Sequence, residues 1–299
     1  MRYNIKTMRI LKIIPILTFF IPFSENLSAQ VSSDWNRDLE ILGKFLQSTP
    51  RSTVDSNMVQ AALFFLNTPY VANTLDMDTL DEEDLTVNFR EMDCMTFVEN
   101  CLALSRMLRY PNPDMDYFER ELRLIRYRNG ALNNYTSRLH YTSDWIFDNV
   151  KKSIIEDITY ALGGQKFKPN VFFMSENYMK YKHLKNNPEA VKEIEAIEHE
   201  INKRGSYYFL PKQEIEAHQS LIKSGDIICF TTSIPGLDIS HFGIAYRYKG
   251  QLTFIHASST AKKVVINPEP LVDYCNKINS NTGIIVLHPL SYNPENVNE

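Results

Sequence analysis

The sequence lacks the motifs that would hold a metal ion or a nucleotide cofactor. It has no His-Glu-x-x-His and no paired Cys-x-x-Cys, and its seven histidines are scattered. It also has no Gly-x-Gly-x-x-Gly segment and no phosphate-binding loop, and Gly163-Gly164 is better explained as a turn. We therefore expect neither a metal ion nor a cofactor.

Further absences narrow the class of protein. The net charge of -4 is close to neutral and no basic stripe stands out, which argues against a nucleic-acid binder. Beyond residue 23 no stretch is long and apolar enough for a membrane span, and no internal repeat is visible. The length suits one large domain or two modest ones.

Residues 1–29 have the pattern of a secretory signal peptide. A basic lead over residues 1–12 precedes an apolar run from Ile13 to Phe23, and Leu27-Ser28-Ala29 ends in a small residue suited to cleavage. The apolar run is too short to span a bilayer comfortably. We expect cleavage near Ala29 and an exported protein, periplasmic or secreted, that is not attached to the membrane.

The four cysteines do not favour disulfide bonds, even in an exported protein. Cys94 and Cys101 are seven residues apart on one predicted helix, roughly 10 Å by helical rise, which is too far to bridge. Cys229 lies in an apolar run and Cys275 in a predicted short helix. One bridge among Cys101, Cys229 and Cys275 stays open, but we expect free thiols.

Cys94 lies where a reactive thiol is favoured. It opens a segment in which Phe97, Cys101, Leu104 and Leu108 recur at helical spacing. A thiol in the first turn of a helix faces unpaired N–H groups and the positive end of the helix dipole. We therefore expect the thiolate of Cys94 to be stabilised.

Two histidines lie on predicted strands about 150 residues further along the chain. Ile239–Tyr246 carries His241, Phe254–Ser258 carries His256, and Tyr248–Gln251 predicts the hairpin turn between them. One cysteine at a helix start and two histidines on adjacent strands can supply a nucleophile, a general base and a group that orients the base. Taken singly, each of the three residues could equally be structural.

The order of the patterns predicts an α+β fold, with helices first and strands later. Residues 34–66 are expected to form two helical segments, and Asn187-Pro188 begins a helix that ends at Gly205. Short aromatic strands are expected at Val171–Met174 and Tyr207–Leu210. After residue 224 the pattern is mostly β.

Four separated segments resemble the NlpC-type cell-wall cysteine peptidases, a papain-like superfamily. In chain order they are Asn67-Thr68-Pro69-Tyr70-Val71, Asp93-Cys94-Met95-Thr96-Phe97-Val98, Ser224-Gly225-Asp226-Ile227-Ile228, and Ser240–Tyr246 followed by Phe254–Ala257. The resemblance covers roughly residues 60–110 and 220–290. It implies one papain-like catalytic domain over 30–299, with N-terminal helices packed on a C-terminal antiparallel sheet or barrel. A large helical and aromatic insertion would occupy roughly 110–220.

The resemblance also assigns roles to individual residues. It makes Cys94 the nucleophile, His241 the general base and His256 the group that orients His241. Tyr70 and Asp93 would lie near the nucleophile, with the Tyr70 hydroxyl near the oxyanion. The backbone N–H of Cys94 would be an oxyanion donor.

The chain departs from this superfamily where Met95-Thr96 replaces Ser-Gly after the nucleophile. With this departure, and with a long middle insertion that contains the segment Arg138–Trp145, the chain is similar to the amidase-like branch of the superfamily. That resemblance implies hydrolysis of the amide between N-acetylmuramic acid and L-alanine in peptidoglycan fragments. We expect a monomer with such muropeptides as its partners. One alternative is an endopeptidase that cuts γ-D-glutamyl-diamino-acid or L-Ala-γ-D-Glu bonds with the same triad. Another is a silent binding module for wall peptides.

Six residues are candidates for binding this substrate: Arg90, Thr96, Tyr141, Asp144, Trp145 and Ser240. The aromatic members suit stacking on a sugar face, the aspartate suits hydrogen bonds to sugar hydroxyls, and the arginine, with Arg128 or Arg138, suits peptide carboxylates. His140 competes with His256 for the third catalytic position, although it does not lie on the hairpin that carries His241.

Overall fold

The computed structural model describes residues 23–75, 83–205 and 207–291. The basic lead of the expected signal peptide and most of its apolar run lie outside the described residues. The chain divides into two units, Met1–Arg37 and Asp38–Glu299. Of the first, the structure describes the beginning of helix α1 (Phe23–Ser48). The sheet and the candidate site belong to the second unit.

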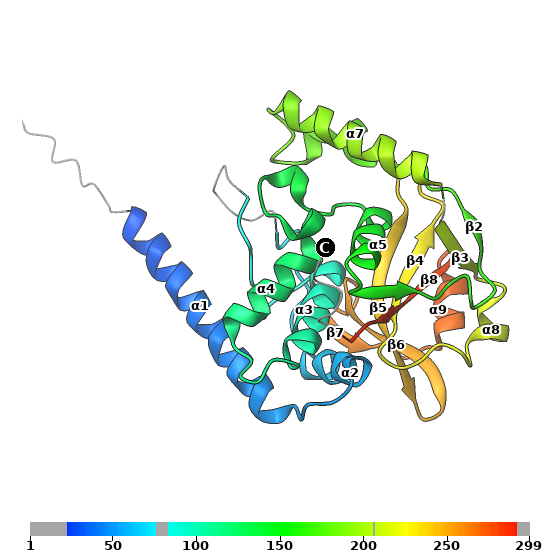
Figure 1. Ribbon diagram of the computed structural model, residues 1–299, viewed down its shortest axis with the longest axis horizontal. Coiled ribbons are helices and arrows are strands. Elements are labelled where there is room, and N and C mark those ends of the chain that lie inside the picture. The colour runs from blue at the N-terminus through cyan, green and yellow to red at the C-terminus, as the bar shows by residue number, and fades with distance from the viewer. Residues whose placement is uncertain (1–22, 76–82, 206, 292–299) are drawn as a thin grey trace, which may run out of the picture. The chain divides into compact units, whose positions relative to one another are not determined.

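Helices dominate the first half of the described chain (Figure 1). After α1 come α2 (Val54–Phe64), α3 (Cys94–Met107), α4 (Met115–Arg126), α5 (Thr142–Lys151), α6 (Phe173–Glu176), α7 (Pro188–Arg204), α8 (Ile215–His218) and α9 (Leu271–Lys277). Three short 3-10 helices are η1 (Arg128–Gly130), η2 (Tyr135–Ser137) and η3 (Tyr178–Lys180). Within the described ranges, no helix combines the length and the apolar character needed to cross a bilayer.

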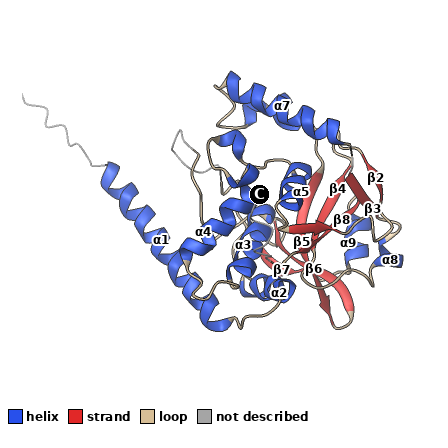
Figure 2. Ribbon diagram, in the orientation of Figure 1, coloured by secondary structure: helices blue, strands red, loops and turns tan. Residues whose placement is uncertain are grey.

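The strands form one eight-stranded antiparallel sheet (Figure 2). They are β1 (Ile155–Asp157), β2 (Gln165–Phe167), β3 (Tyr207–Pro211), β4 (Ile227–Thr232), β5 (Ile239–Tyr248), β6 (Gln251–Ser258), β7 (Lys263–Ile266) and β8 (Asn281–Pro289). Their order is β2-β3-β8-β4-β5-β6-β7, and β1 also pairs with β8. The α+β prediction is confirmed. The middle segment supplies β1, β2 and β3, so it is built into the main sheet.

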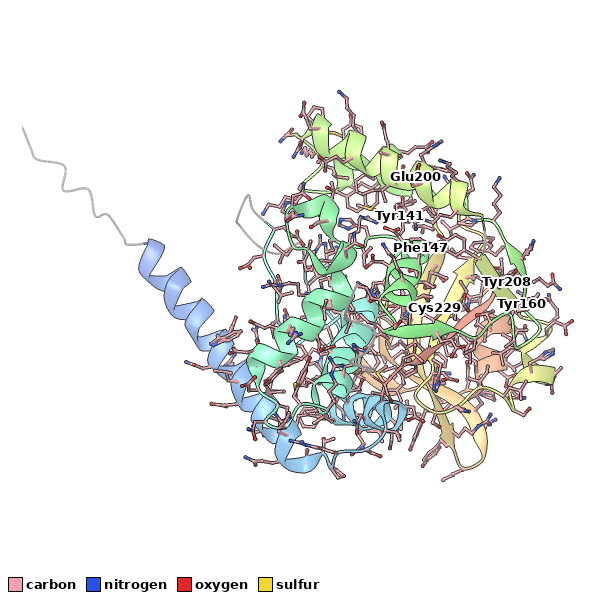
Figure 3. The ribbon with its side chains drawn as sticks, viewed as in Figure 1. Tyr141, Phe147, Tyr160, Glu200, Tyr208 and Cys229 are labelled. Atoms are coloured by element: carbon pink, nitrogen blue, oxygen red, sulfur yellow. The ribbon has the colours of Figure 1, made fainter. Side chains whose placement is uncertain are left out.

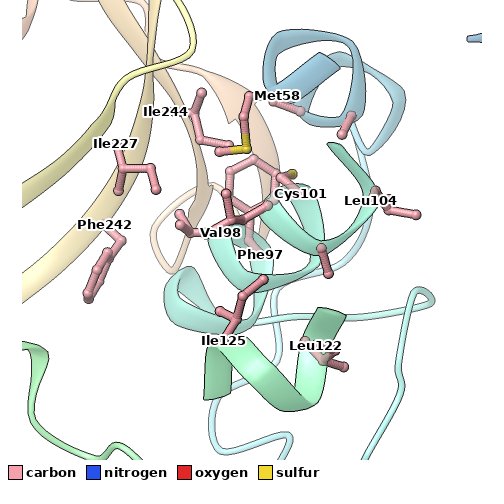
Figure 4. Packing of buried hydrophobic residues seen from close by; sticks show 14 of the residues in the cluster. Met58, Phe97, Val98, Cys101, Leu104, Leu122, Ile125, Ile227, Phe242 and Ile244 are labelled. Atoms are coloured by element: carbon pink, nitrogen blue, oxygen red, sulfur yellow. The ribbon is translucent and has the colours of Figure 1, made fainter. Parts of the chain in front are cut away.

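A buried core joins α3 to the sheet and to its neighbouring helices. Figure 4 shows Phe97, Val98 and Cys101 of α3 packed among Met58 of α2 and Ile244 of β5. All five side chains are fully buried. Burial of side chains of this size contributes about 1.5–3 kcal/mol each. This packing fixes the position of α3, and therefore of its first residue, Cys94, against β5.

Local sequence signals placed most of these elements correctly. The helix expected from Asn187 is α7: Asn187 caps it by accepting the Ala190 N–H at 3.1 Å, and Gly205 ends it with φ 63°. The strand expected at Tyr207–Leu210 is β3.

The strand expected at Val171–Met174 is wrong. Phe173 begins α6, and Val171 makes only an isolated bridge to Gly236. The hydroxyl of Tyr141 accepts the Met174 N–H at 2.8 Å, so this backbone is satisfied by a distant side chain. Aromatic composition alone could not distinguish this arrangement from a strand.

The Ser224-Gly225-Asp226 turn holds β4, β5 and α2 together. The Gly225 N–H donates to the Ala245 carbonyl, and the Ala245 N–H donates back to the Asp226 carbonyl. Gly225 has φ +97°, and a Cβ there would lie 2.4 Å from the Asp55 carbonyl oxygen. Only glycine therefore permits both the backbone conformation and the close approach to α2.

Gly225→Ala should destabilise the protein much more than Gly250→Ala. Both glycines have positive φ, +97° and +84°, but a Cβ at Gly250 would meet no atom within 4 Å. We expect Gly250→Ala to lower the free energy of unfolding by about 1 kcal/mol and Gly225→Ala by about 3 kcal/mol or more. Urea unfolding measures both. Equal losses would mean that the contact with Asp55 does not restrict this turn.

Candidate active site

A capping box fixes the first turn of α3 around Cys94. The Asp93 carboxylate accepts the N–H groups of Met95 at 3.1 Å and Thr96 at 2.9 Å, and the Thr96 hydroxyl accepts the Asp93 N–H at 2.9 Å. The Asp93 side chain does not engage the Cys94 N–H. Thr96 is buried and its hydroxyl serves the cap, so the structure gives it no place in substrate binding.

Tyr70 lies beside this first turn. The Met92 N–H donates to the Pro69 carbonyl at 3.1 Å and the Val71 N–H donates to the Met92 carbonyl at 3.2 Å. Burial raises the pKa of Tyr70, and negative charge at Cys94 and then at Asp93 raises it further. The structure therefore brings Tyr70 within electrostatic reach of the sulfur.

Cys94 is partly exposed and lines a hollow of about 250 Å³. Burial, followed by the Asp93 carboxylate, raises the pKa of Cys94 to about 12. The nearby backbone N–H groups of Phe242, Cys94 and Met95 lower the pKa and so favour the thiolate, but by less. The expectation that the thiolate of Cys94 is stabilised is therefore wrong for the substrate-free protein. Desolvation of the sulfur raises the pKa more than the N–H groups at the helix start lower it.

The predicted hairpin brings the two histidines together. β5 and β6 pair antiparallel, and His241 Nε2 lies 2.6 Å from His256 Nδ1. The rings meet edge to face with centroids 4.9 Å apart. Phe230 and Phe254 pack against them, and burial lowers the pKa of His241 to about 4. Burial and then His241 lower the pKa of His256 to about 3.

A β-bulge precedes His241. His241 pairs with Phe230 but Ile239 pairs with Thr231, so Ser240 is an extra residue in β5. Bulges change the direction in which neighbouring side chains point. Ser240 is exposed and lines the Cys94 hollow, while its hydroxyl reaches Asn281 at 3.3 Å.

No direct hydrogen bond joins Cys94 and His241 in the described chain. Phe242, which follows His241, lines the same hollow as Cys94, and its backbone N–H lowers the pKa of the thiol. The hydrogen bond between a nucleophile and its general base is often long or poorly aligned before substrate binds. The assignment of Cys94, His241 and His256 as a triad therefore stays a prediction, with all three residues in one region.

Tyr274 of α9 belongs to the same region and was missed by the sequence reasoning. Its ring centroid lies 6.3 Å from that of His241 and 5.9 Å from that of His256. Burial, followed by negative charge at Cys94, raises the pKa of Tyr274 to about 12. Nothing in the pattern around Tyr274 and Cys275 signals this position, because α9 reaches it through the tertiary fold.

His140 lines the Cys94 hollow but is not paired with His241. Its Nε2 lies 2.8 Å from the Tyr135 carbonyl oxygen. Burial and then the charge of Arg138 lower its pKa well below the usual value. The imidazole that contacts His241 is therefore that of His256 and not that of His140.

The predicted arginine and aspartate ligands already have protein partners. Asp144 is buried and bonds Arg128 at 2.5 Å and Arg204 at 2.6 Å. Arg90 pairs with the buried Asp38 at 3.3 Å. Asp144 and Arg90 are therefore already neutralised by ion pairs within the protein.

Trp145 and Tyr141 support the site from the side of α5. Trp145 is completely buried and its ring meets that of Phe242 edge to face at 6.3 Å, so no sugar can stack on it in this structure. Tyr141 lines the Cys94 hollow, but its hydroxyl donates to Glu198 at 2.7 Å.

The other three cysteines form no disulfide bond. Cys101, Cys229 and Cys275 are buried and free. In the described ranges, no cluster of three or more His, Cys, Asp and Glu side chains could hold a metal ion.

A family model described as AmiA-like, N-acetylmuramoyl-L-alanine amidase-like, matches residues 60–284, which include the middle segment. The chain belongs to this family. A crystal structure of an N-acetylmuramoyl-L-alanine amidase from Bacteroides uniformis is similar to it, with 38% identity over 80% of this chain and 99% of that chain and a TM-score of 0.75.

Two other crystal structures are similar to this family member. One, from Bacteroides fragilis, is provisionally described as a xylanase; it has 43% identity over 76% of this chain and 99% of its own, with a TM-score of 0.71. The other, from Legionella pneumophila, has 20% identity over 90% of this chain and 98% of its own, with a TM-score of 0.67, and shows the fold alone. No curated protein matches the chain.

Iodoacetamide should modify Cys94 much faster than Cys101, Cys229 or Cys275, because only Cys94 is partly exposed. Since the pKa of Cys94 is raised to about 12, its alkylation rate should rise about tenfold per pH unit through the neutral range. Peptide mass spectrometry of the folded protein measures each rate. A plateau near neutral pH would instead indicate a preformed thiolate–imidazolium pair.

Acid should destabilise the protein through the buried histidines. Their folded pKa values of about 4 and about 3 lie below the ordinary value of 6.5. Between these values the unfolded chain binds more protons, so the free energy of unfolding falls as pH drops through this window. His256→Gln should flatten the dependence, and His199→Gln, at an exposed position of α7, is the control. Urea unfolding at several pH values measures the slopes; identical slopes in all three proteins would contradict the neutral pair.

Proposed function

We propose that the protein is an exported, monomeric cysteine hydrolase with a papain-like catalytic domain. Its substrate would be the amide between N-acetylmuramic acid and L-alanine in peptidoglycan fragments. The observation that carries the chemistry is the 2.6 Å contact between His241 and His256, next to Phe242, which lines the same hollow as Cys94. The family match, and the amidase description of the Bacteroides uniformis relative, support the choice of bond.

The contact between the histidines determines which tautomer can serve as base. His241 Nε2 faces His256 Nδ1, so Nδ1 of His241 is the nitrogen left to accept a proton. Nε2 must then carry the hydrogen and donate it to His256. His256 keeps this orientation when His241 becomes an imidazolium.

The reaction begins from a neutral pair. The Cys94 sulfur attacks the amide carbon while its proton passes to His241, because burial disfavours both separated charges. The Cys94 N–H, which the Asp93 cap leaves unused, and the Tyr70 hydroxyl are suited to the oxyanion. His241 then protonates the leaving nitrogen, and water hydrolyses the thioester.

Two hollows near the predicted triad offer room for the two parts of the substrate. Cys94, His140 and Tyr141 line the hollow of about 250 Å³. His241 and His256 line another of about 600 Å³. A sugar-bearing acyl group and a peptide amine require two such spaces.

Glycoside hydrolysis has less support. It generally requires two carboxyl groups that flank the scissile bond. Asp238 is the only carboxylate among the described residues that line the Cys94 hollow. It is buried and accepts the N–H groups of Ser143 at 2.6 Å and Ile239 at 2.8 Å, so it is committed to the backbone.

Substitutions in the triad should have unequal effects on kcat/KM. Cys94→Ser should abolish turnover. His241→Ala removes the base and should lower kcat/KM by about 10³-fold, within the usual range for general acid–base catalysis. His256→Gln can still accept a hydrogen bond from His241 and should retain more activity than His241→Ala. His199→Gln is the matched control, and equal losses for it and His241→Ala would contradict the assignment.

The product identifies the bond. With a muramyl peptide, in free or 1,6-anhydro form, we expect a peptide that begins with L-alanine and a sugar with a free lactyl carboxylate. Removing the sugar should slow cleavage, because remote binding energy positions the amide. Mass spectrometry separates the products. A sugar that still carries L-Ala-D-Glu, or equal cleavage of the bare peptide, would favour the endopeptidase.

A further inference from the structure

Helix α5 separates the candidate active site from another hollow. Trp145 packs toward Phe242 and the active site. Other residues of α5 line a hollow of about 600 Å³, which lies in the size range of small-molecule sites. The residues that give this α5 hollow its chemistry are Phe147, Lys151, Asp157, Tyr160, Arg204, Tyr207 and Tyr208.

Exposed aromatic rings distinguish the α5 hollow. Phe147 and Tyr160 are 45% and 68% exposed, high fractions for large aromatic side chains. The Tyr160 and Tyr208 rings lie 4.9 Å apart, and the Arg204 guanidinium lies 3.9 Å from the centre of the Phe147 ring. Figure 3 shows Phe147 beside α5 and Tyr160 with Tyr208 toward β2 and β3. Rings gathered on an accessible surface mark a binding site.

Tyr207 gives the hollow an unsatisfied polar group. Its side chain is only 5% exposed, and its hydroxyl makes no hydrogen bond of acceptable geometry in the described chain. Burial raises the pKa of Tyr207, and the Arg204 guanidinium, which is close enough for a weak hydrogen bond, lowers it by less. A buried hydroxyl without a well-formed hydrogen bond costs free energy, which a ligand with hydrogen-bonding groups would recover.

Charged groups border the rings. Lys151 is exposed, and Asp157 is half-buried while its carboxylate accepts the Thr159 N–H at 2.9 Å. Arg204 is tied to Asp144 and stacked on Phe147. The hollow therefore combines aromatic faces with a cation, a carboxylate and a buried hydroxyl.

We propose that the α5 hollow binds a pyranose ring of a glycan chain. One face of such a ring is C–H and suits Phe147, Tyr160 or Tyr208, while its hydroxyls suit Tyr207 and Asp157. An apolar protein helix would cover the rings but would offer the Tyr207 hydroxyl no hydrogen bond. The choice of an N-acetylhexosamine glycan as ligand rests on the proposed function.

This site would act apart from the catalytic chemistry. α5 is about 10 Å wide, so a sugar in the hollow does not touch Cys94. A glycan held there would keep its attached peptides near the active site and raise their effective concentration.

Binding is best tested with the Cys94→Ser protein and chitotetraose, a β-1,4-linked N-acetylglucosamine tetramer. Isothermal titration calorimetry should show saturable binding that Tyr160→Ala weakens by about tenfold or more. Tyr207→Phe removes only the hydroxyl, so it should weaken binding without lowering Tm. Tyr248→Ala, at an exposed tyrosine of the β5–β6 hairpin, should leave binding unchanged.

The outcomes separate this proposal from the amidase proposal. Absence of binding at millimolar chitotetraose, or equal binding by Tyr160→Ala and its parent, would overturn the glycan site even if muramyl peptides are cleaved. Binding that depends on Tyr160 would support the site even if a different amide is cut. Loss of a dimer on Tyr160→Ala, seen by sedimentation, would show instead that a second copy covers this surface and would also overturn the proposal.

Discussion

The capping box at Asp93 and Thr96 fixes the first turn of α3, and this turn carries Cys94 into the hollow that Phe242 of β5 also lines. Phe97, immediately behind this turn, is fully buried in the core. A shift of the cap would therefore move the thiol and disturb the core together. The reactive group is placed by a helix start, and the helix start is placed by the packing that stabilises the fold.

Strand β5 also fixes the positions of the two histidines through its close contact with β6. A Cβ at Gly243 would lie 2.5 Å from the Phe254 ring, so glycine allows β6 to approach closely. Phe254 in turn packs on His256, which meets His241 at 2.6 Å. The same apolar surroundings make charge costly on both the thiol and the imidazoles. Oriented N–H groups act more strongly in such surroundings than in water, which favours charge that forms only during reaction.

Helix α5 connects the middle segment to this region. Trp145 supports Phe242, and the preceding residue, Asp144, forms an ion cluster with Arg128 and Arg204. Arg204 ends α7 and also stacks on Phe147 in the α5 hollow. The middle segment therefore acts as part of the domain, since its strands also pair within the main sheet.

The sequence by itself determined the features that depend on neighbouring residues. The start of α3 at Cys94, the caps of α7 and the hairpin between the histidine strands follow from periodicity, capping and turn chemistry. Only the tertiary structure decided what is buried and what pairs across the chain. It enclosed Trp145, joined Asp144 to Arg204 60 residues away, brought Tyr274 to the histidines and raised the pKa of Cys94. Desolvation and long-range contacts depend on the packed surroundings of a side chain, and residue spacing along the chain does not specify those surroundings.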